Sequence, residues 1–320
     1  MRCVLALLLV QTAVVFRPAH PATPHRQTRP QNTRTAEQKV DEPVRLHSDL
    51  VVLSVSVLNA TGEYARGLAA RDFTVLEDGA QQSLNSFSAE EAPFAAAILV
   101  DMSVSMERKF GLVRAAAASF IEHIRDNDQV AVFGFNDKIR LFQDFSSARD
   151  ITDYIWEARA EGNTRLYDCM DRAVEALSKR PELRRALLLI TDGWDSTSRD
   201  ASLDSVMKRA LAAGVTVYSI DLIDDDLMIG SASYVEPLRR GRRDMQALAA
   251  QTGGRYVNSP QGDKLESAFN DIVDELRNQY TITYYSTNDR RDGRWRKLEV
   301  RAARADVTTR TRRGYWAPKK

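Results

Sequence analysis

Short segments rich in hydroxyls and carboxylates follow apolar stretches of the chain. Asp101-Met102-Ser103-Val104-Ser105 comes directly after the apolar run 95–100, and Thr191-Asp192-Gly193 comes after the run 186–190. Between them, Gly162-Asn163-Thr164 precedes a helical pattern. Oxygen donors of this kind suit Mg²⁺, Mn²⁺ or Ca²⁺ rather than zinc or copper. The side chains with such donors are Asp101, Ser103, Ser105, Thr164, Thr191 and Asp192.

The spacing within the first segment supports a cation site. In an extended loop, alternate side chains face the same way, so Ser103 and Ser105 can both reach an ion beside Asp101. Two carboxylates and neutral hydroxyls leave a divalent ion with residual positive charge. An open coordination position on that ion would attract a carboxylate from outside the chain.

The surrounding elements alternate between strands and helices, which predicts a doubly wound parallel α/β sheet. Ligands of such sheets lie outside the carboxyl ends of the strands, where these polar segments fall. Apolar runs, typical of buried strands, predict strands at 95–100, 130–135, 139–142, 186–190, 215–220 and 255–257. Helical periodicity predicts helices at about 107–125, 148–160, 167–178, 202–213, 243–252 and 264–278.

Period-two, β-rich sequence lies on both sides of this α/β region. The strands expected before it are 50–58, 73–76 and 83–87, and those after it are 280–285, 295–301 and 307–312. Neither flank has enough strands to be stable alone. We therefore predict that residues 44–92 and 280–320 fold together as a small β-sandwich-like domain, into which an α/β domain of residues 93–279 is inserted.

The N-terminal segment predicts export. Arg2 precedes the uncharged apolar run 4–16, which is typical of a secretory signal peptide and short for a membrane span. We assign residues 1–22 to a signal peptide, with an uncleaved N-terminal anchor as the alternative, and 23–43 to a disordered linker rich in Pro, Thr, Gln and Arg. No other segment is expected to cross a membrane. The protein is thus expected to be periplasmic or secreted.

The three polar segments, in this order along the chain, resemble the metal-ion-dependent adhesion site of von Willebrand factor A (VWA) domains. The resemblance covers about residues 93–280 and implies a Rossmann-like fold. The segments Asp72-Phe73-Thr74-Val75-Leu76-Glu77-Asp78-Gly79 and Arg313-Gly314-Tyr315-Trp316 extend it to exported bacterial VWFA-related proteins.

The resemblance also implies a ligand set and a partner. Ser103, Ser105 and Thr164 would hold the ion directly or through water, and Asp101 and Asp192 would bind it directly or support the other ligands. A protein ligand with an exposed Asp or Glu would complete the coordination shell. The function so implied is metal-dependent, adhesion-type protein binding without catalysis.

Rival functions lack the residues that they need. The chain has no Gly-x-Ser-x-Gly nucleophile motif, and three of its four histidines, His20, His25 and His47, lie outside the α/β region. The fourth, His123, falls within a helix, so a metal-assisted hydrolase is disfavoured. The first polar segment has no glycine-rich loop for a dinucleotide. A structural scaffold, in which the metal only stabilises loops, is the chief alternative.

The charge distribution of the chain gives limited further information on function. The net charge of +1 gives no reason to expect nucleic acid binding. Residues 286–320 hold 12 Lys and Arg against four Asp and Glu, an excess of eight positive charges. This excess could bind an anionic polymer or a lipid headgroup, but a solvated sheet face explains it better. The run 221–226 contains four aspartates and suggests either a second cation site or, preferably, a solvated loop. Cys169 is expected to be buried, and no disulfide framework is possible.

Overall fold

The computed structural model describes residues 50–89, 91–147, 159–223, 229, 231–258 and 263–319. These residues belong to one compact unit. The predicted signal peptide and linker, and residues 148–158 of the predicted helix 148–160, lie outside the described residues. Within the described residues, no helix is both long and apolar enough to cross a membrane.

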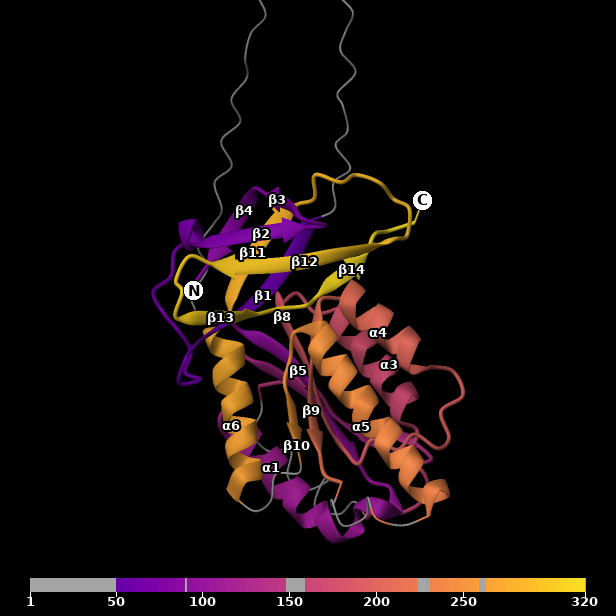
Figure 1. Cartoon of the computed structure of the whole chain (residues 1–320). Coiled ribbons are helices and arrows are strands. Elements are labelled where there is room, and N and C mark those ends of the chain that lie inside the picture. The colour runs from indigo at the N-terminus through magenta and orange to yellow at the C-terminus, as the bar shows by residue number, and fades with distance from the viewer. Residues whose placement is uncertain are drawn as a thin grey trace, which may run out of the picture. The chain divides into compact units, whose positions relative to one another are not determined.

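A six-stranded sheet forms the centre of the α/β region (Figure 1). Its order is β10-β9-β8-β5-β6-β7, and all neighbouring pairs are parallel except β6 with β7. Only residues 136–138 separate β6 from β7, which is enough for a hairpin but too short for a parallel crossover. The bounds are β5 (Phe94–Asp101), β6 (Gln129–Phe135), β7 (Ile139–Ser146), β8 (Arg184–Thr191), β9 (Val215–Asp221) and β10 (Tyr256–Asn258).

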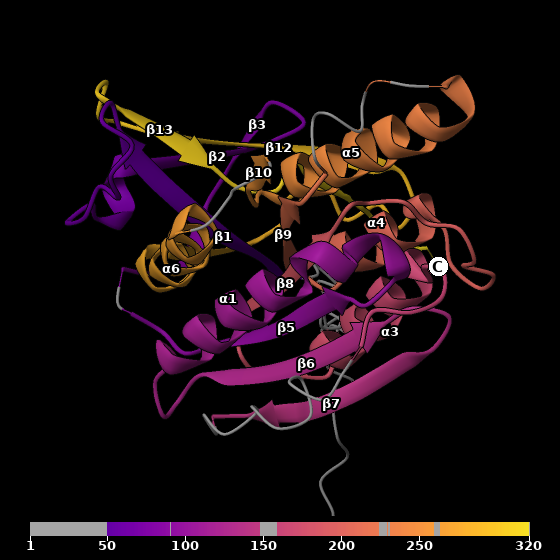
Figure 2. The same ribbon diagram turned by 90° about the horizontal axis from the view of Figure 1, so that it is seen from below.

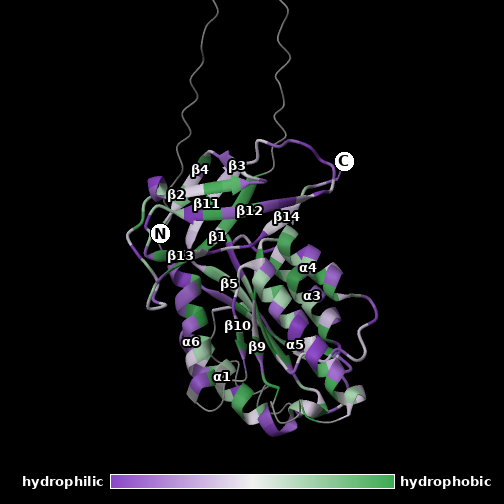
Figure 3. Cartoon of the chain, in the orientation of Figure 1, coloured by the Kyte–Doolittle hydropathy of each residue, from purple (hydrophilic) through white to green (hydrophobic). Residues whose placement is uncertain are grey.

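Helices cover both faces of this sheet, as Figures 1 and 2 show. One apolar core lies under α1 (Phe110–Glu122) and α6 (Asp263–Asn278), and a second core lies under α3 (Leu166–Ser178), α4 (Leu203–Ala212) and α5 (Ala232–Thr252). A 3-10 turn, η2 (Val104–Lys109), leads into α1. Figure 3 shows the apolar strands between helices whose outer surfaces are largely polar. The doubly wound α/β architecture is therefore confirmed.

Helix α5 begins at Ala232, eleven residues before the predicted start at 243. The prediction was wrong because Pro237 and Gly241, residues of the kind that usually mark helix ends, lie inside the helix. Gly241 has a packing role: a Cβ there would come within 2.2 Å of the Gly193 carbonyl oxygen. The helix ends at Gly253, whose φ of 84° is the left-handed conformation that glycine adopts readily.

The two β-rich flanks form a sandwich of two antiparallel sheets. One sheet has the order β13-β1-β11-β4 and the other β14-β12-β2-β3. Apolar side chains from both sheets share a single core, so the flanks fold together, as predicted. The elements are β1 (Leu50–Asn59), η1 (Ala70–Asp72), β2 (Phe73–Glu77), β3 (Ala80–Gln82), β4 (Leu84–Ser88), β11 (Tyr280–Tyr285), β12 (Trp295–Ala302), β13 (Val307–Arg310) and β14 (Gly314–Trp316).

A buried arginine joins the sandwich to the α/β region. Arg184 begins β8 and is fully buried. Its guanidinium donates hydrogen bonds to the carbonyl oxygens of Leu276, Arg277 and Gln279, at 3.1, 2.9 and 2.6 Å. These carbonyls lie at the end of α6 and just after it, where a helix has no backbone donors of its own and favours a positive charge. Arg184 therefore caps α6 where the chain enters β11.

A second buried junction lies beside it. The carboxylate of Glu275 accepts hydrogen bonds from Ser56 Oγ at 2.9 Å and from the Tyr218 hydroxyl at 3.1 Å, and it forms an ion pair with Arg310. Ser56 and Arg310 belong to the sandwich, whereas Tyr218 belongs to β9. The first junction lies at the amino end of β8 and the second reaches the middle of β9, so both lie away from the carboxyl ends of the central strands.

We expect the substitution Arg184→Met to lower the free energy of unfolding by about 3 kcal/mol or more, because several buried carbonyls lose a charged donor. Urea unfolding followed by circular dichroism measures this change. Arg301→Met is the control: the Arg301 side chain is exposed, and in the described part of the chain its guanidinium bonds Glu299 alone, so its loss should cost less than about 0.5 kcal/mol. Equal effects of the two substitutions would contradict this role of Arg184.

Candidate functional site

The order of the central sheet reverses between β5 and β8. From β5 the chain runs to β6 on one side, and from β8 it runs to β9 on the other. Loops that leave neighbouring strands in opposite directions open a crevice at the carboxyl ends, which is where α/β sheets bind ligands. The β5 strand ends at Asp101 and the β8 strand at Thr191, so the sequence segments 101–105 and 191–193 meet at this crevice.

Asp101 is fully buried at the centre of the crevice. One carboxylate oxygen accepts a hydrogen bond from the backbone N–H of Ser103 at 2.9 Å, and the other accepts one from the Thr191 hydroxyl at 2.5 Å. The Thr191 hydroxyl also accepts a hydrogen bond from the Gly193 N–H. Thr191, included among the residues with suitable donors, is therefore positioned to orient Asp101 and the turn that follows β8.

The two serines lie beside the carboxylates. Ser103 Oγ and Ser105 Oγ are 3.0 Å apart, as the spacing of two predicted. The Ser105 side chain hydrogen-bonds the Asp192 carboxylate, which also accepts the Trp194 N–H. Ser103 is buried, whereas Ser105 is exposed. The structure thus brings Asp101, Ser103, Ser105 and Asp192 together, and leaves an opening to solvent at Ser105.

The loop that carries Thr164 runs along the first segment. The backbone N–H of Glu161 donates to the Met102 carbonyl at 2.8 Å, and Val104 N–H donates to the Gly162 carbonyl at 3.2 Å. Gly162 has a φ of 74°, and a Cβ there would meet the Asp137 carboxylate. These contacts hold the start of the loop that carries Thr164, itself buried, against residues 102–104.

The two carboxylates repel each other in the protein interior. Burial and then the charge of Asp192 raise the pKa of Asp101 to about 7. Burial also raises the pKa of Asp192, although hydrogen bonds from Ser105 and the Trp194 N–H oppose this. A cation between the two groups would relieve both the repulsion and the cost of burial.

The donors fit a hard divalent ion. In the described part of the chain, no group of three or more His, Cys, Asp or Glu residues gathers to hold a metal. This crevice has only two carboxylates, and its other donors are hydroxyls, a set that suits Mg²⁺, Mn²⁺ or Ca²⁺. Asp101, Ser103, Ser105, Thr164 and Asp192 would hold the ion, whose residual charge would attract a further oxygen ligand.

The von Willebrand factor type A domain model matches residues 96–194, which span all three loops. The chain contains a von Willebrand factor type A domain. No curated protein matches the sequence.

Solved structures similar to this VWA chain include several of bacterial and animal origin. A von Willebrand factor type A structure from Catenulispora acidiphila is 12% identical, with a TM-score of 0.49 over 84% of this chain and 74% of that one. An aerotolerance-related membrane protein from Bacteroides fragilis is 16% identical, with a TM-score of 0.44 over 58% and 98%. The mussel byssus proximal thread matrix protein 1, described with a zinc-occupied MIDAS motif, is 19% identical, with a TM-score of 0.47 over 63% and 50%.

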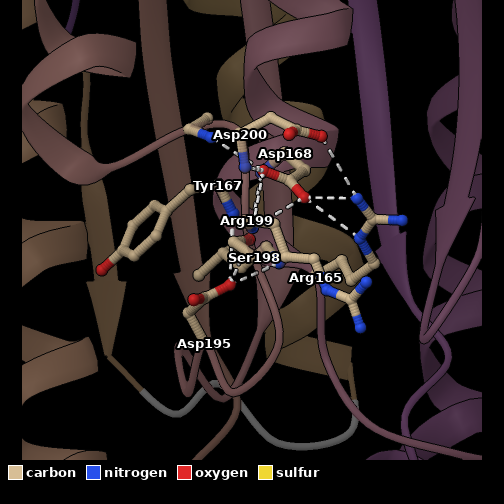
Figure 4. Close-up of polar contacts among 9 residues, drawn as sticks. Arg165, Tyr167, Asp168, Asp195, Ser198, Arg199 and Asp200 are labelled. Atoms are coloured by element: carbon tan, nitrogen blue, oxygen red, sulfur yellow. Dashed lines mark hydrogen bonds and ion pairs between the residues drawn. The ribbon is translucent and has the colours of Figure 1, made fainter.

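Two further aspartates of the VWA domain hold the site loops, and the sequence analysis did not identify them. Asp168, in the first turn of α3, accepts hydrogen bonds from the backbone N–H groups of Arg199, Asp200 and Ala201, and from the Arg165 guanidinium (Figure 4). It thereby fixes the chain between Asp192 and α4. Carboxylates near a helix start are a common signal, but their partners here lie about 30 residues away.

Asp195 makes the reciprocal link. Its Oδ1 accepts the N–H of Leu166 at 2.9 Å and the Ser198 hydroxyl at 2.5 Å, as Figure 4 shows. Leu166 is the first residue of α3, whose free N–H groups favour a carboxylate. Asp195 thus supplies the N-terminal cap of the helix that follows Thr164. The loop that carries Thr164 and leads into α3 is therefore held to the loop that follows Asp192 by bonds in both directions.

Other residues considered from the sequence lie apart from this arrangement. Asp221, at the start of the aspartate run 221–226, is fully buried and bonded to Arg242 at 2.7 Å and to the Tyr256 hydroxyl. It was expected to lie in a solvated loop, but its position at the end of β9 buries it; residues 224–226 lie outside the described residues. His123 ends α1, with its ring nitrogen bonded to the Ser119 carbonyl. Cys169 is buried, as expected.

We expect Asp168→Ala to lower the free energy of unfolding by about 3 kcal/mol, because three N–H groups and a guanidinium lose their acceptor. Burial opposes ionisation of Asp168, but the bonds from Arg165 and the backbone outweigh it and lower its pKa below 3.8. A depressed folded-state pKa stabilises the fold above the unfolded value and loses that effect as pH falls through the folded one.

The pH dependence provides the check. The stability difference between the wild type and Asp168→Asn should be largest above about pH 4, and it should narrow as the pH falls below that value. Urea unfolding at a series of pH values between about 2.5 and 7 measures it. A difference that is constant over this range would show that the ionised form of Asp168 is not what stabilises the loop.

Proposed function

We propose that this VWA domain binds one divalent cation, Mg²⁺ or Mn²⁺ in preference to others, and uses it to hold a carboxylate of a protein ligand. One observation carries the proposal: the buried carboxylates of Asp101 and Asp192 converge with the Ser103 and Ser105 hydroxyls at the switch point of the sheet. The ion would be held by Asp101, Ser103, Ser105, Thr164 and Asp192. It would supply positive charge and an open coordination position.

The surface around the crevice supports an outside ligand rather than an internal one. Ser105 is exposed, and the neighbouring Val104 leaves 62% of its surface in solvent. An exposed apolar residue beside a charged site is a favourable contact for a partner. The main alternative is a scaffold in which a sixth ligand from the chain itself completes the coordination shell.

The proposal includes a role without catalysis and a location outside the cytoplasm. The second part rests on the N-terminal sequence, where Arg2 precedes the apolar run 4–16. The first part rests on the donors, which are hydroxyls and two carboxylates. His123, the one histidine in the described part of the chain, instead bonds the Ser119 carbonyl. Binding of an acidic protein ligand is consistent with both the donor set and the N-terminal segment.

We expect Mg²⁺ or Mn²⁺ to raise the melting temperature of the wild type. At a metal concentration a hundred times Kd, linkage stabilises the folded state by about 2.7 kcal/mol, which corresponds to roughly 5–10 °C for a domain of this size. Differential scanning calorimetry in EDTA and in a metal series that includes Ca²⁺ and Zn²⁺ measures it. The Asp101→Asn/Asp192→Asn variant keeps the shapes of both side chains but should show no shift.

Thr191→Val supplies a second comparison, since it removes the hydroxyl that orients Asp101 but none of the proposed ligands. Loss of such a supporting hydrogen bond typically weakens metal binding about 10–100-fold.

In EDTA, the Asp101→Asn/Asp192→Asn variant should melt no lower than the wild type, because two repelling carboxylates are gone. Equal metal shifts in the wild type and the double variant would refute the assignment of the site.

The open coordination position has its own test. We expect Mn²⁺-loaded wild type to broaden the methyl proton resonance of acetate more strongly than that of acetamide, which has the same shape without the charge. Paramagnetic relaxation in solution NMR measures this, with the Asp101→Asn/Asp192→Asn variant as the control for free Mn²⁺. If metal stabilises the fold but acetate gains no extra relaxation over the control, the scaffold alternative is correct.

A further inference from the structure

A cavity of about 740 Å³ adjoins the proposed metal site. Its wall begins at Gly193, the residue after Asp192, and continues through Trp194 and Asp195. The first turn of α4 and the middle of α5 form the other sides, with Leu203 and Pro237 as apolar contacts. The volume lies within the usual range for ligand pockets. The cavity therefore begins one residue from a proposed metal ligand.

The charge of the lining is mainly negative. Among the described residues, four carboxylates line it, those of Asp195, Asp204, Glu236 and Asp244, against the guanidinium of Arg240. Asp204 and Glu236 are exposed and form surface ion pairs with Lys208 and Arg243. Exposed ion pairs of this kind contribute little to stability, so these two carboxylates can readily exchange one cationic partner for another.

The inner two carboxylates have neutral partners only. Asp244 accepts the Tyr167 hydroxyl at 2.7 Å, and Asp195 uses one oxygen for N–H groups and a serine hydroxyl. Neither forms an ion pair within the described part of the chain. Figure 4 shows the Tyr167 ring and the Asp195 carboxylate on the side of the loop away from Arg165. Aromatic and apolar walls with unneutralised carboxylates are complementary to a long cationic side chain.

The walls of the cavity are fixed by close packing. Gly193 and Gly241 approach so closely that a Cβ on either would lie within 3 Å of the other's backbone. This contact holds the middle of α5 against the loop that carries Asp192. The cavity and the proposed metal site therefore share one rigid segment, residues 192–195, so that a single ligand can contact both.

We propose that this cavity binds the guanidinium or ammonium group of a basic residue in the same protein ligand whose carboxylate reaches the metal. The inference rests on the proposed function and names the second recognition element of the partner: an Arg or Lys a few residues from the metal-binding Asp or Glu. The aliphatic part of the basic side chain packs on Trp194, Leu203 and Pro237, and its charge faces Asp195 and Asp244.

Synthetic peptides test this arrangement. Blocked peptides with one Glu and one Arg, separated by one to four glycines, are compared with peptides in which citrulline, a neutral isostere, replaces Arg, or Gln replaces Glu. With Mg²⁺ present, isothermal titration calorimetry of the full chain should show that the best Arg peptide binds about tenfold more tightly than its citrulline counterpart.

Matched variants locate the effect. Asp244→Asn leaves the α3 cap untouched and should lower the Arg-to-citrulline ratio, while the preference for Glu over Gln is retained. Asp195→Asn/Asp244→Asn, in which an amide oxygen can still accept from α3 and Tyr167, should bring the ratio close to one. Asp306→Asn removes an exposed acid of the sandwich and should leave the ratio unchanged.

The outcomes separate the two proposals. A Glu preference without an Arg preference in the wild type would overturn the inference on the cavity and leave the proposed function intact. Loss of the Glu preference would refute the proposed function, and agmatine, which has a guanidinium but no carboxylate, then tests the cavity alone. It should shift the NMR amide resonances of Trp194 and Asp195 in metal-free wild type but not in the double variant; no shift, or equal shifts in both, would overturn the inference.

Discussion

Two like charges held together in the protein interior set the main constraint on this structure. Asp101 and Asp192 lie at the ends of neighbouring parallel strands, and burial disfavours ionisation of both. The charge of Asp192 adds to this effect at Asp101. Neutral donors are directed at them: the Ser103 N–H, the Thr191 and Ser105 hydroxyls and the Trp194 N–H. The charge of Lys109 also favours the ionised form of Asp192, yet the pKa of both carboxyl groups stays raised. A divalent cation, as proposed for this site, would offset the remaining cost.

The opposite end of the sheet supplies the stability that such a site requires. Arg184 begins the same strand whose far end carries Thr191, and it caps α6 while the Glu275 network joins β9 to the sandwich. Both junctions are buried and satisfied by several partners. Strained or repelling groups persist at functional sites when the surrounding structure holds them in place. The sandwich, built from both ends of the chain, contributes to function indirectly through this rigid attachment.

The fold was largely predictable from sequence because its signals are local. The apolar run 95–100 and the alternation of strands and helices are sufficient for a doubly wound sheet, and the weakness of each β-rich flank implied that the flanks pair. The start of α5 was not predictable, because Pro237 and Gly241 usually indicate a helix end, and the need for Gly241 arises only from its contact with Gly193. The same holds for Asp221, whose burial depends on Arg242 and Tyr256 from elements further along the chain.

The candidate site was likewise predictable where its signals are local in sequence and not where they depend on distant contacts. Its three loops were identified from Asp, Ser and Thr spacing, and the structure places them side by side, whereas their role in metal binding stays a prediction. Asp168 and Asp195 were missed because each is an ordinary polar residue whose backbone N–H partners lie about 30 residues away. No spacing rule reveals such a pair.

The turn after β8 connects the two halves of the proposed binding surface. Gly193 has a φ of 77°, a conformation that side-chain-bearing residues rarely adopt, and this reversal separates Asp192, which faces Ser105, from Trp194 and Asp195, which line the cavity. A Cβ at Gly193 would also lie 2.9 Å from the Gly241 backbone, so the turn is fixed by α5 as well. Because one short segment orients both the carboxylate for the ion and the carboxylate for a cation of the partner, the separation of the two charges is set by the fold. Selectivity for a partner would then depend on the spacing of its own acidic and basic residues.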